Sequence, residues 1–206
     1  MHNLKSSAEG RNPPDVSPLA ALLHPSNDAF ADLQRLVSPG EQVALFTASP
    51  LVVPGDWQVG RSRWIDQMIC EASLPAPSVA PLRLWTKDVP EMLELAAATE
   101  PGPFLPQTIQ MGSYFGIHAS DGRLVAMAGK RLQSISFTEI SAVCTLPEFR
   151  GRGYARALTT FLAARILAAG KIPFLHVKSE NGAKVVYQKI GFRLRAAIYL
   201  TVLSLR

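Results

Sequence analysis

The sequence predicts a mixed α/β protein built on one mostly antiparallel sheet. Apolar and β-branched runs of strand length recur in the second half of the chain, and three of them have short connections that favour antiparallel pairing. Two amphipathic helix patterns alternate with the later strand signals, and a strand–helix–strand connection predicts one parallel pair. The 206 residues are 48% hydrophobic, which is enough apolar material for a packed core.

Composition and charge exclude several classes of protein. The formal net charge is +5, but the basic residues are scattered and not interleaved with aromatic ones, so no nucleic-acid partner is expected. No run approaches the roughly 18 uninterrupted apolar residues of a membrane span. Cys70 and Cys144 lie far apart and outside any metal-binding pattern, so we expect no metal site and two reduced thiols. These features predict a cytoplasmic protein without a membrane partner.

The N-terminal part is expected to differ from the rest of the chain. Residues 1–25 contain four prolines and are predicted to form a flexible arm without a signal peptide. Prolines cluster again over Ser73–Pro81, which indicates a boundary between an N-terminal α/β section, 26–79, and a main domain, 80–206. Within the N-terminal section we expect a helix from Ser26 to Val37, a strand over Gln42–Thr47 and a short amphipathic helix over Ser62–Glu71.

The main domain is expected to hold most of the sheet. Asp88 as a cap and Pro90 in the first turn mark a helix over Thr86–Thr99. Ser120-Asp121-Gly122 is typical of a hairpin turn. The other expected strands are Leu82–Trp85, Ser113–Ala119, Arg123–Leu132, Phe137–Leu146, Ile172–Val177 and Phe192–Leu205, and the other expected helices are Gly153–Ala169 and Gly182–Ile190.

A strand that runs into a Gly/Arg loop carries the clearest functional signal. Pro147 ends the apolar strand, and Gly151 and Gly153 allow the backbone to turn tightly and approach a ligand closely. The first amides of the following helix lack partners within the helix and favour an anion. With Arg150 and Arg152 beside them, these amides predict a phosphate or pyrophosphate site.

Two motifs together resemble the GNAT superfamily of N-acetyltransferases. The loop Arg150-Gly151-Arg152-Gly153-Tyr154-Ala155 matches its Arg/Gln-x-x-Gly-x-Gly/Ala signature, and Asn181 followed by Tyr187-Gln188-Lys189-Ile190-Gly191-Phe192 matches its later Asn and Tyr-x-x-x-Gly-Phe pattern. The segment Gly129–Arg152 looks like the subgroup related to glycine N-acyltransferases. The resemblance covers roughly 80–206, and it implies the GNAT acyl-CoA N-acyltransferase fold, in which the parallel strand pair splays apart.

The resemblance also implies acetyl-CoA as co-substrate. The loop would hold its pyrophosphate, and backbone groups of Val143 and Thr145 would bond the pantetheine arm as an added strand would. The Val143 N–H would polarise the acetyl carbonyl, and Tyr187 would be the general acid toward the thiolate. The implied coenzyme-binding residues are Val143, Cys144, Thr145, Arg150, Gly151, Arg152, Gly153, Tyr154, Ala155, Asn181 and Tyr187.

The general base is left with alternatives. Glu139 is a carboxylate on an otherwise apolar strand, so it is either the base or an ion-pair partner of Arg131 or Lys130. His176 would also accept a proton near neutral pH. Cys144 as a covalent nucleophile is disfavoured, because alternation along a strand would place it on the opposite face from Glu139.

The leading hypothesis is acetyl transfer to a primary amine of a small molecule or peptide by direct attack in a ternary complex. The alternative is a non-catalytic, acyl-CoA-binding regulatory module. The acceptor is expected at the loops Glu100–Gln110 and Ala196–Tyr199. The N-terminal section 26–79, read as a degenerate half of the same fold, would shape that pocket or form a homodimer contact.

Overall fold

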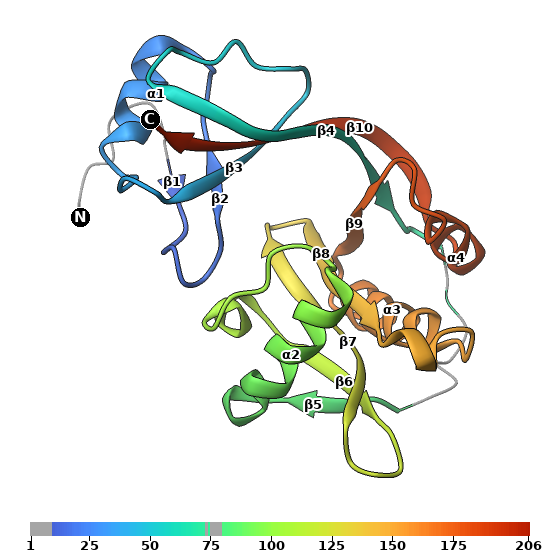
Figure 1. The fold of residues 1–206 in the computed structure, drawn as a ribbon. Helices are drawn as coiled ribbons and strands as arrows, with labels where there is room; N and C mark the ends of the chain where they lie inside the picture. The colour runs from blue at the N-terminus through green and yellow to red at the C-terminus, as the bar shows by residue number, and fades with distance from the viewer. Residues whose placement is uncertain (1–9, 73, 75–79) are drawn as a thin grey trace, which may run out of the picture. The chain divides into compact units, whose positions relative to one another are not determined.

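The computed structural model describes residues 10–72, 74 and 80–206 (Figure 1). Packing divides the chain into two compact units, and each is described by itself. The first comprises the chain up to Ile65 together with Ala197–Arg206, and the second comprises Asp66–Ala196. Strands β4 (Trp57–Ile69) and β10 (Arg193–Leu205) each contribute residues to both units. The division into domains at 26–79 and 80–206 stays a prediction about folding.

The first unit confirms the predicted helix from Ser26 and the predicted strand after it. The Ala29 N–H donates to Ser26 Oγ at 3.2 Å and so caps the helix. Phe30, Leu33 and Trp57 are buried in its core. The elements are β1 (Gly10–Arg11), β2 (Leu19–Ala21), α1 (Asn27–Gln34) and β3 (Gln42–Thr47), with β2 parallel and β10 antiparallel to β3.

Two expectations about the N-terminal part need correction. The expected flexible arm contains β1 and β2 where it is described, and its residues 1–9 lie outside the described chain. The helix predicted over Ser62–Glu71 is wrong, because these residues belong almost entirely to strand β4. Ile65, Met68 and Ile69 are all buried, so burial along β4 departs from simple alternation and imitates a helical pattern.

The second unit confirms the mixed sheet, with strand order β4–β9–β8–β7–β6–β5. Neighbours from β5 to β8 are antiparallel, and β8 and β9 are parallel, as predicted. The long β segment at the end of the chain is one strand, β10. The other elements are β5 (Leu82–Leu84), β6 (Tyr114–His118), β7 (Leu124–Gln133), β8 (Phe137–Thr145), β9 (Ile172–Lys178), α2 (Val89–Thr99), α3 (Tyr154–Ala168), α4 (Lys184–Ile190) and the short 3-10 turns η1 (Thr86–Asp88), η2 (Thr108–Met111) and η3 (Pro147–Phe149).

Helices cover both faces of this sheet (Figure 1). On one face, Leu158 and Leu162 of α3 pack in a cluster that includes Phe115 of β6. On the other face, Met92 of α2 packs in a cluster that includes Tyr114, the residue before Phe115. Successive strand residues therefore enter opposite layers, as strand geometry requires. Among the described residues, no helix is both long and apolar enough to cross a membrane.

Gly129 on β7 is required for the packing of the α2 face. A Cβ atom added there would lie 2.2 Å from Cδ1 of the buried Tyr114. We expect Gly129→Ala to lower the free energy of unfolding by about 1–3 kcal/mol, because the ring must move out of a filled core. Urea denaturation measures this. Gly182→Ala is the matched control, since a Cβ there meets nothing within 4 Å. Equal midpoints for the two variants would contradict the packing account.

Candidate active site

The parallel strands β8 and β9 separate after only three residue pairs. Their register runs from Phe137↔Ile172 to Glu139↔Phe174 and then ends, although β8 continues to Thr145 and β9 to Lys178. Beyond this point, among the described residues, β8 has β7 as its one strand neighbour. The edge of β8 that faces the split can therefore hydrogen-bond an extended ligand through its backbone.

A bulge in β8 lies within the split. Ser141 pairs with Gly129 and Cys144 with Met127, so Ala142 and Val143 both lie opposite one residue of β7. Ala142 has φ 52°, a left-handed conformation that costs a residue with a Cβ about 1–2 kcal/mol. Bulges leave the extra residue unpaired and redirect its peptide groups. This geometry suits the predicted role of the Val143 N–H, which stays a prediction.

The bulge also corrects the expected orientation of Cys144. Ile140 packs in the α3 cluster, whereas Ala142 and Cys144 pack in the α2 cluster. The extra residue thus reverses the alternation, and Cys144 lies on the same face as Glu139, not the opposite one. Burial raises the pKa of the Cys144 thiol to about 11. The thiolate that a covalent acyl-cysteine would need is therefore scarce at neutral pH.

The Gly/Arg loop has the backbone geometry predicted for it. Gly151 and Gly153 have φ of 77° and 80°, and α3 begins directly afterwards at Tyr154. No side chain caps the helix, so its first N–H groups remain available to an anion. Arg150 Nε donates to the carbonyl of Thr145 at 3.4 Å, and the Arg152 guanidinium lies 4.7 Å from the ring centre of Phe149.

Thr145 joins the split to the loop and has an unsatisfied hydroxyl group. Its Oγ1 atom is buried and has no hydrogen-bond partner among the residues that the structure describes. Buried hydroxyl groups are nearly always paired, so this one favours a ligand at the end of β8. Together with the split edge and the uncapped helix, it favours an extended ligand that follows β8 toward the start of α3.

Tyr187 and Asn181 belong to the segment after β9. Burial, and secondarily the nearby Cys144, raise the pKa of the Tyr187 phenol to about 12, so it keeps its proton at neutral pH. Asn181 Oδ1 accepts a hydrogen bond from the Ala183 N–H at 2.9 Å within the turn before α4. The expected cap by Asn181 is wrong, because α4 starts at Lys184, its cap residue is Ala183 and no side chain caps it. The coenzyme contacts expected of Tyr187 and Asn181 stay predictions.

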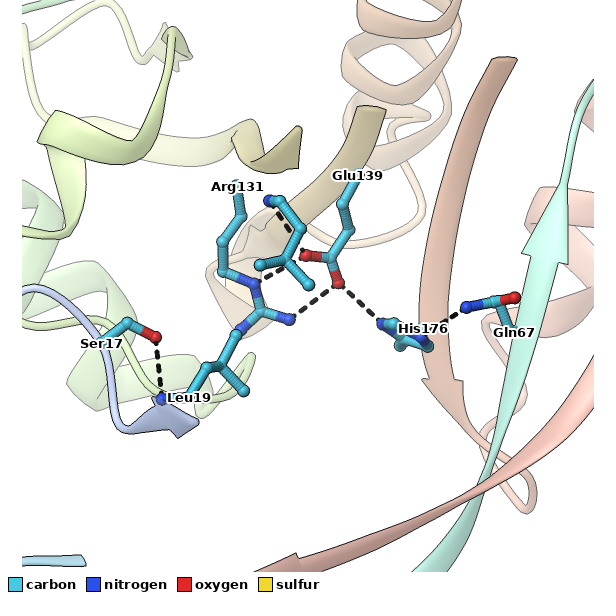
Figure 2. A network of polar contacts seen from close by, with 7 residues as sticks. Ser17, Leu19, Gln67, Arg131, Glu139 and His176 are labelled. Carbon is cyan, nitrogen blue, oxygen red and sulfur yellow. Dashed lines mark hydrogen bonds and ion pairs between the residues drawn. The ribbon is translucent and has the colours of Figure 1, made fainter. Parts of the chain in front are cut away.

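Glu139 is the centre of a chain of polar contacts (Figure 2). It is 1% exposed and accepts two hydrogen bonds from Arg131, at 2.8 and 2.7 Å. His176 Nδ1 lies 2.8 Å from its Oε1 atom. Burial alone would raise the pKa of Glu139, but Arg131 and then His176 lower it to about 2. Of the alternatives for Glu139, the ion pair with Arg131 is therefore present, and a carboxylate of this pKa is a weak base at neutral pH.

Two residues without any signal in the sequence extend this chain. Gln67 Nε2 lies 3.1 Å from His176 Nε2, and Arg195 donates to Gln67 Oε1 at 2.6 Å. Both residues also line a cavity of ≈ 300 Å³. Neither predicted acceptor loop contributes to this cavity, whose lining residues are Gln67, Ile69, Leu132, Gln133, Ser134, Phe137, Phe174 and Arg195.

Comparisons with known proteins agree with this architecture. Residues 114–200 match the family model described as FR47-like protein. A GNAT-family protein from Novosphingobium aromaticivorans DSM 12444 is 36% identical, with a TM-score of 0.87 over 98% of this chain and 91% of that chain. A GCN5-related N-acetyltransferase from Kribbella flavida is 16% identical, with a TM-score of 0.61 over 97% of this chain and 90% of that chain, and shows the fold. A search of curated proteins finds no match.

The split sheet and the loop that leads into α3 thus define a protein with the GNAT acyltransferase fold. At 36% identity over nearly its whole length to a GNAT-family protein, the chain belongs to the GNAT family of N-acetyltransferases. This confirms the resemblance at the level of the superfamily. The likeness to glycine N-acyltransferases stays a prediction. Among the described residues, no group of three or more His, Cys, Asp or Glu side chains is placed to hold a metal ion.

The buried charge of Glu139 predicts a pH-dependent contribution to stability. Its pKa in the fold, about 2, lies below its ordinary 4.5. The ionised form therefore stabilises the fold above pH 4.5, and this contribution is lost as the pH falls from 4.5 toward 2. Urea denaturation at pH 6 and at pH 2 measures this. We expect the free energy of unfolding to fall between these pH values by a few kcal/mol more in the wild type than in Glu139→Gln.

Two further variants control this measurement. Glu148→Gln removes an exposed carboxylate and should keep the wild-type pH dependence. Glu139→Gln leaves Arg131 buried without its partner and will itself destabilise the fold. The double variant Arg131→Met/Glu139→Leu removes both charges and should also show the shallow pH dependence. If the free energy of unfolding of the double variant depended on pH as steeply as that of the wild type, the buried ion pair would not be the source of the pH dependence.

Proposed function

We propose that this protein transfers an acetyl group from acetyl-CoA to a primary amine by direct attack in a ternary complex. The observation that carries the proposal is the split between β8 and β9 with a bulge at Ala142 and an uncapped helix behind it. A redirected peptide group at Ala142 and Val143, a backbone edge that continues to Thr145 and a row of helix amides succeed one another along a single stretch of chain. An acyl-CoA carries its groups in the same order: its thioester carbonyl, its pantetheine arm and its pyrophosphate.

Each part of the chain would have one task. The helix amides after Gly153, with Arg150 and Arg152, would bind the pyrophosphate. The β8 backbone at Val143 and Thr145 would orient the arm, and the Thr145 hydroxyl would gain a partner. The Val143 N–H would stabilise the negative charge that develops on the carbonyl oxygen. Bound acetyl-CoA supplies an activated acyl group, so no nucleophile of the enzyme is needed.

The Tyr187 phenol is the proposed proton donor to the departing thiolate. It is buried in the core cluster that includes α3, and burial raises its pKa to about 12, so it is protonated at neutral pH. We expect Tyr187→Phe to lower kcat by about 10²-fold while leaving the Kd for CoA within about threefold. Release of free thiol from acetyl-CoA with a panel of amines measures kcat, and calorimetry measures Kd. Tyr199→Phe is the matched control, since that hydroxyl bonds Ser62 in the other unit.

The same experiment separates the enzyme from a non-catalytic acyl-CoA-binding module. Thiol release that requires an amine and is lost in Tyr187→Phe supports the enzyme. Coenzyme binding without thiol release for any amine of the panel would support the module instead.

Substitution of the two glycines at the ends of α3 tests the proposed pyrophosphate-binding site. Gly153 and Gly170 both have positive φ, 80° and 72°, and a Cβ on either meets nothing within 4 Å. Alanine at either position should therefore cost similar stability, about 1 kcal/mol. Calorimetry should show that Gly153→Ala raises the Kd for CoA about tenfold, because the loop and the first amides move, whereas Gly170→Ala leaves it unchanged. Equal affinities of the two variants for CoA would contradict a pyrophosphate-binding site at the start of α3.

A further inference from the structure

We propose that the cavity beside His176 is the acceptor pocket, that His176 takes the first proton from the acceptor amine, and that Gln67 holds the place of that amine until it binds. The preferred acceptor would be a primary amine with an apolar body and a carboxylate next to the amine. This inference rests on the proposed function and adds to it a base and a class of acceptor.

The contacts of Gln67 determine which nitrogen of His176 carries a proton. Arg195 is a donor only, and it bonds Gln67 Oε1, so the amide of Gln67 presents its NH₂ group to His176. An NH₂ group donates, so His176 Nε2 must be the acceptor. Its Nδ1 then carries the hydrogen and donates to Glu139. The chain of contacts therefore holds a neutral imidazole whose Nε2 lone pair points at Gln67.

The charged groups around His176 favour its role as a base. From β8, Glu139 accepts the Nδ1–H, and it would stabilise an imidazolium once Nε2 is protonated. From β7, Arg131 keeps Glu139 ionised and fixed. On β4 the facing group is the uncharged Gln67, whose amide Arg195 of β10 holds. Glu139 is thus a positioning residue in this scheme, and His176 is the group that touches the substrate.

The position of His176 along the sheet also suits a base that acts on the acceptor amine. It follows Phe174, the last residue of β9 that pairs with β8, by two positions, so it lies at the start of the split. It shares a face with Glu139, the last paired residue of β8. An amine at Nε2 would therefore stand where the two strands begin to part, which is the end of the split reached by the acyl group.

The cavity indicates what the amine carries. Phe137 and Phe174, whose ring centres are 6.5 Å apart, line it together with Ile69 and Leu132, so it fits an apolar body. None of its described lining residues is acidic, and Arg195 is basic, which disfavours a polycation. Gln67 gives an N–H to His176 and a carbonyl oxygen to Arg195. An amine with a neighbouring carboxylate offers the same two functions and so can replace Gln67 at both partners.

Each of the three N–H protons of an ammonium substrate has a destination in this reaction. His176 Nε2 takes one proton, and the freed lone pair attacks the thioester carbon. The C–N bond forms and the C–S bond breaks, and the sulfur receives a second nitrogen proton by way of Tyr187. The third stays on the amide product, and His176 returns its proton to solvent.

Acetylation kinetics test the class of acceptor. With saturating acetyl-CoA, L-phenylalanine should have at least a tenfold higher kcat/KM than 2-phenylethylamine, which lacks the carboxylate, or spermidine, which is a polycation. Arg195→Met should remove the advantage of L-phenylalanine over 2-phenylethylamine. Arg35→Met, a change at an exposed arginine of the other unit, should keep it. A preference for spermidine, or an Arg195→Met variant with the advantage intact, would overturn the assigned class while leaving the acetyltransferase itself in place.

Two variants distinguish the proposed role of His176 as the base from that of Gln67, the residue that the amine displaces. His176→Gln should lower kcat about 10²-fold and leave the KM for acetyl-CoA unchanged, whereas His24→Gln should behave as wild type. Gln67→Ala should lower the KM for the amine with little change in kcat, because the amine no longer displaces an amide. A large loss of kcat in Gln67→Ala, or a wild-type kcat in His176→Gln, would refute the scheme.

A measurement that needs no turnover keeps this inference separate from the proposed function. Long-range ¹H–¹⁵N NMR of the wild-type protein should show His176 with its hydrogen on Nδ1, and its signals should shift when L-phenylalanine is added. Hydrogen on Nε2, or no response to L-phenylalanine, would overturn the inference even if acetylation of another amine were observed. The predicted tautomer and response without any thiol release would instead refute the proposed function alone.

Discussion

The ladder between β8 and β9 stops at Glu139 and Phe174, and the arrangement of the site follows from that stop. Parallel strands normally exchange evenly spaced hydrogen bonds along their length. Here β8 keeps its antiparallel partner β7 and loses its parallel one, so beyond Glu139 the backbone groups on its β9 side have no strand partner among the described residues. The bulge at Ala142 lies in this unpaired stretch and redirects the chain just before the loop. A ligand that pairs like a strand would satisfy the backbone groups that the fold leaves open.

A buried ion pair lies at the point where the strands part. Removing Glu139 and Arg131 from water is costly, and their bidentate contact, together with His176, offsets that cost. The ion pair links β7 to β8, and the contact of His176 with Glu139 links β9 to β8. The last paired residue of β8 is thus held on two sides by charged hydrogen bonds, which are stronger than neutral ones. This network lies where the split begins, and its Gln67 end lines the cavity.

Much of the fold could be predicted, because its elements are separated by glycine, proline and capping residues. The helix at Thr86–Thr99 and the hairpin at Asp121-Gly122 are local features, and the structure confirms them. Strand β4 was misread because Trp64, Ile65, Met68 and Ile69 happen to follow a helical spacing. The bulge at Ala142 also escaped prediction, since nothing in Ile140–Cys144 marks an extra residue. It depends on the pairing with β7, which is 12 or more residues away in the chain.

The site was predictable only where its residues are close together in sequence. The loop of Arg150–Ala155 is one contiguous motif, and Glu139 was noticeable as a charge in an apolar strand. Gln67 and Arg195 lie on strands at opposite ends of the unit's sequence, and neither stands out from its neighbours. Only the folded sheet brings them to His176. Polar networks of this kind depend on long-range packing and carry little local signal.

The split in the sheet is the proposed binding site of the coenzyme. A crystal structure of the protein grown with acetyl-CoA would show whether the coenzyme binds there. We expect electron density for the pyrophosphate at the first amides of α3, with the pantetheine arm bonded to the β8 backbone at Val143 and Thr145. Coenzyme density outside the split, with β8 and β9 unchanged and the Thr145 hydroxyl still unpaired, would contradict it.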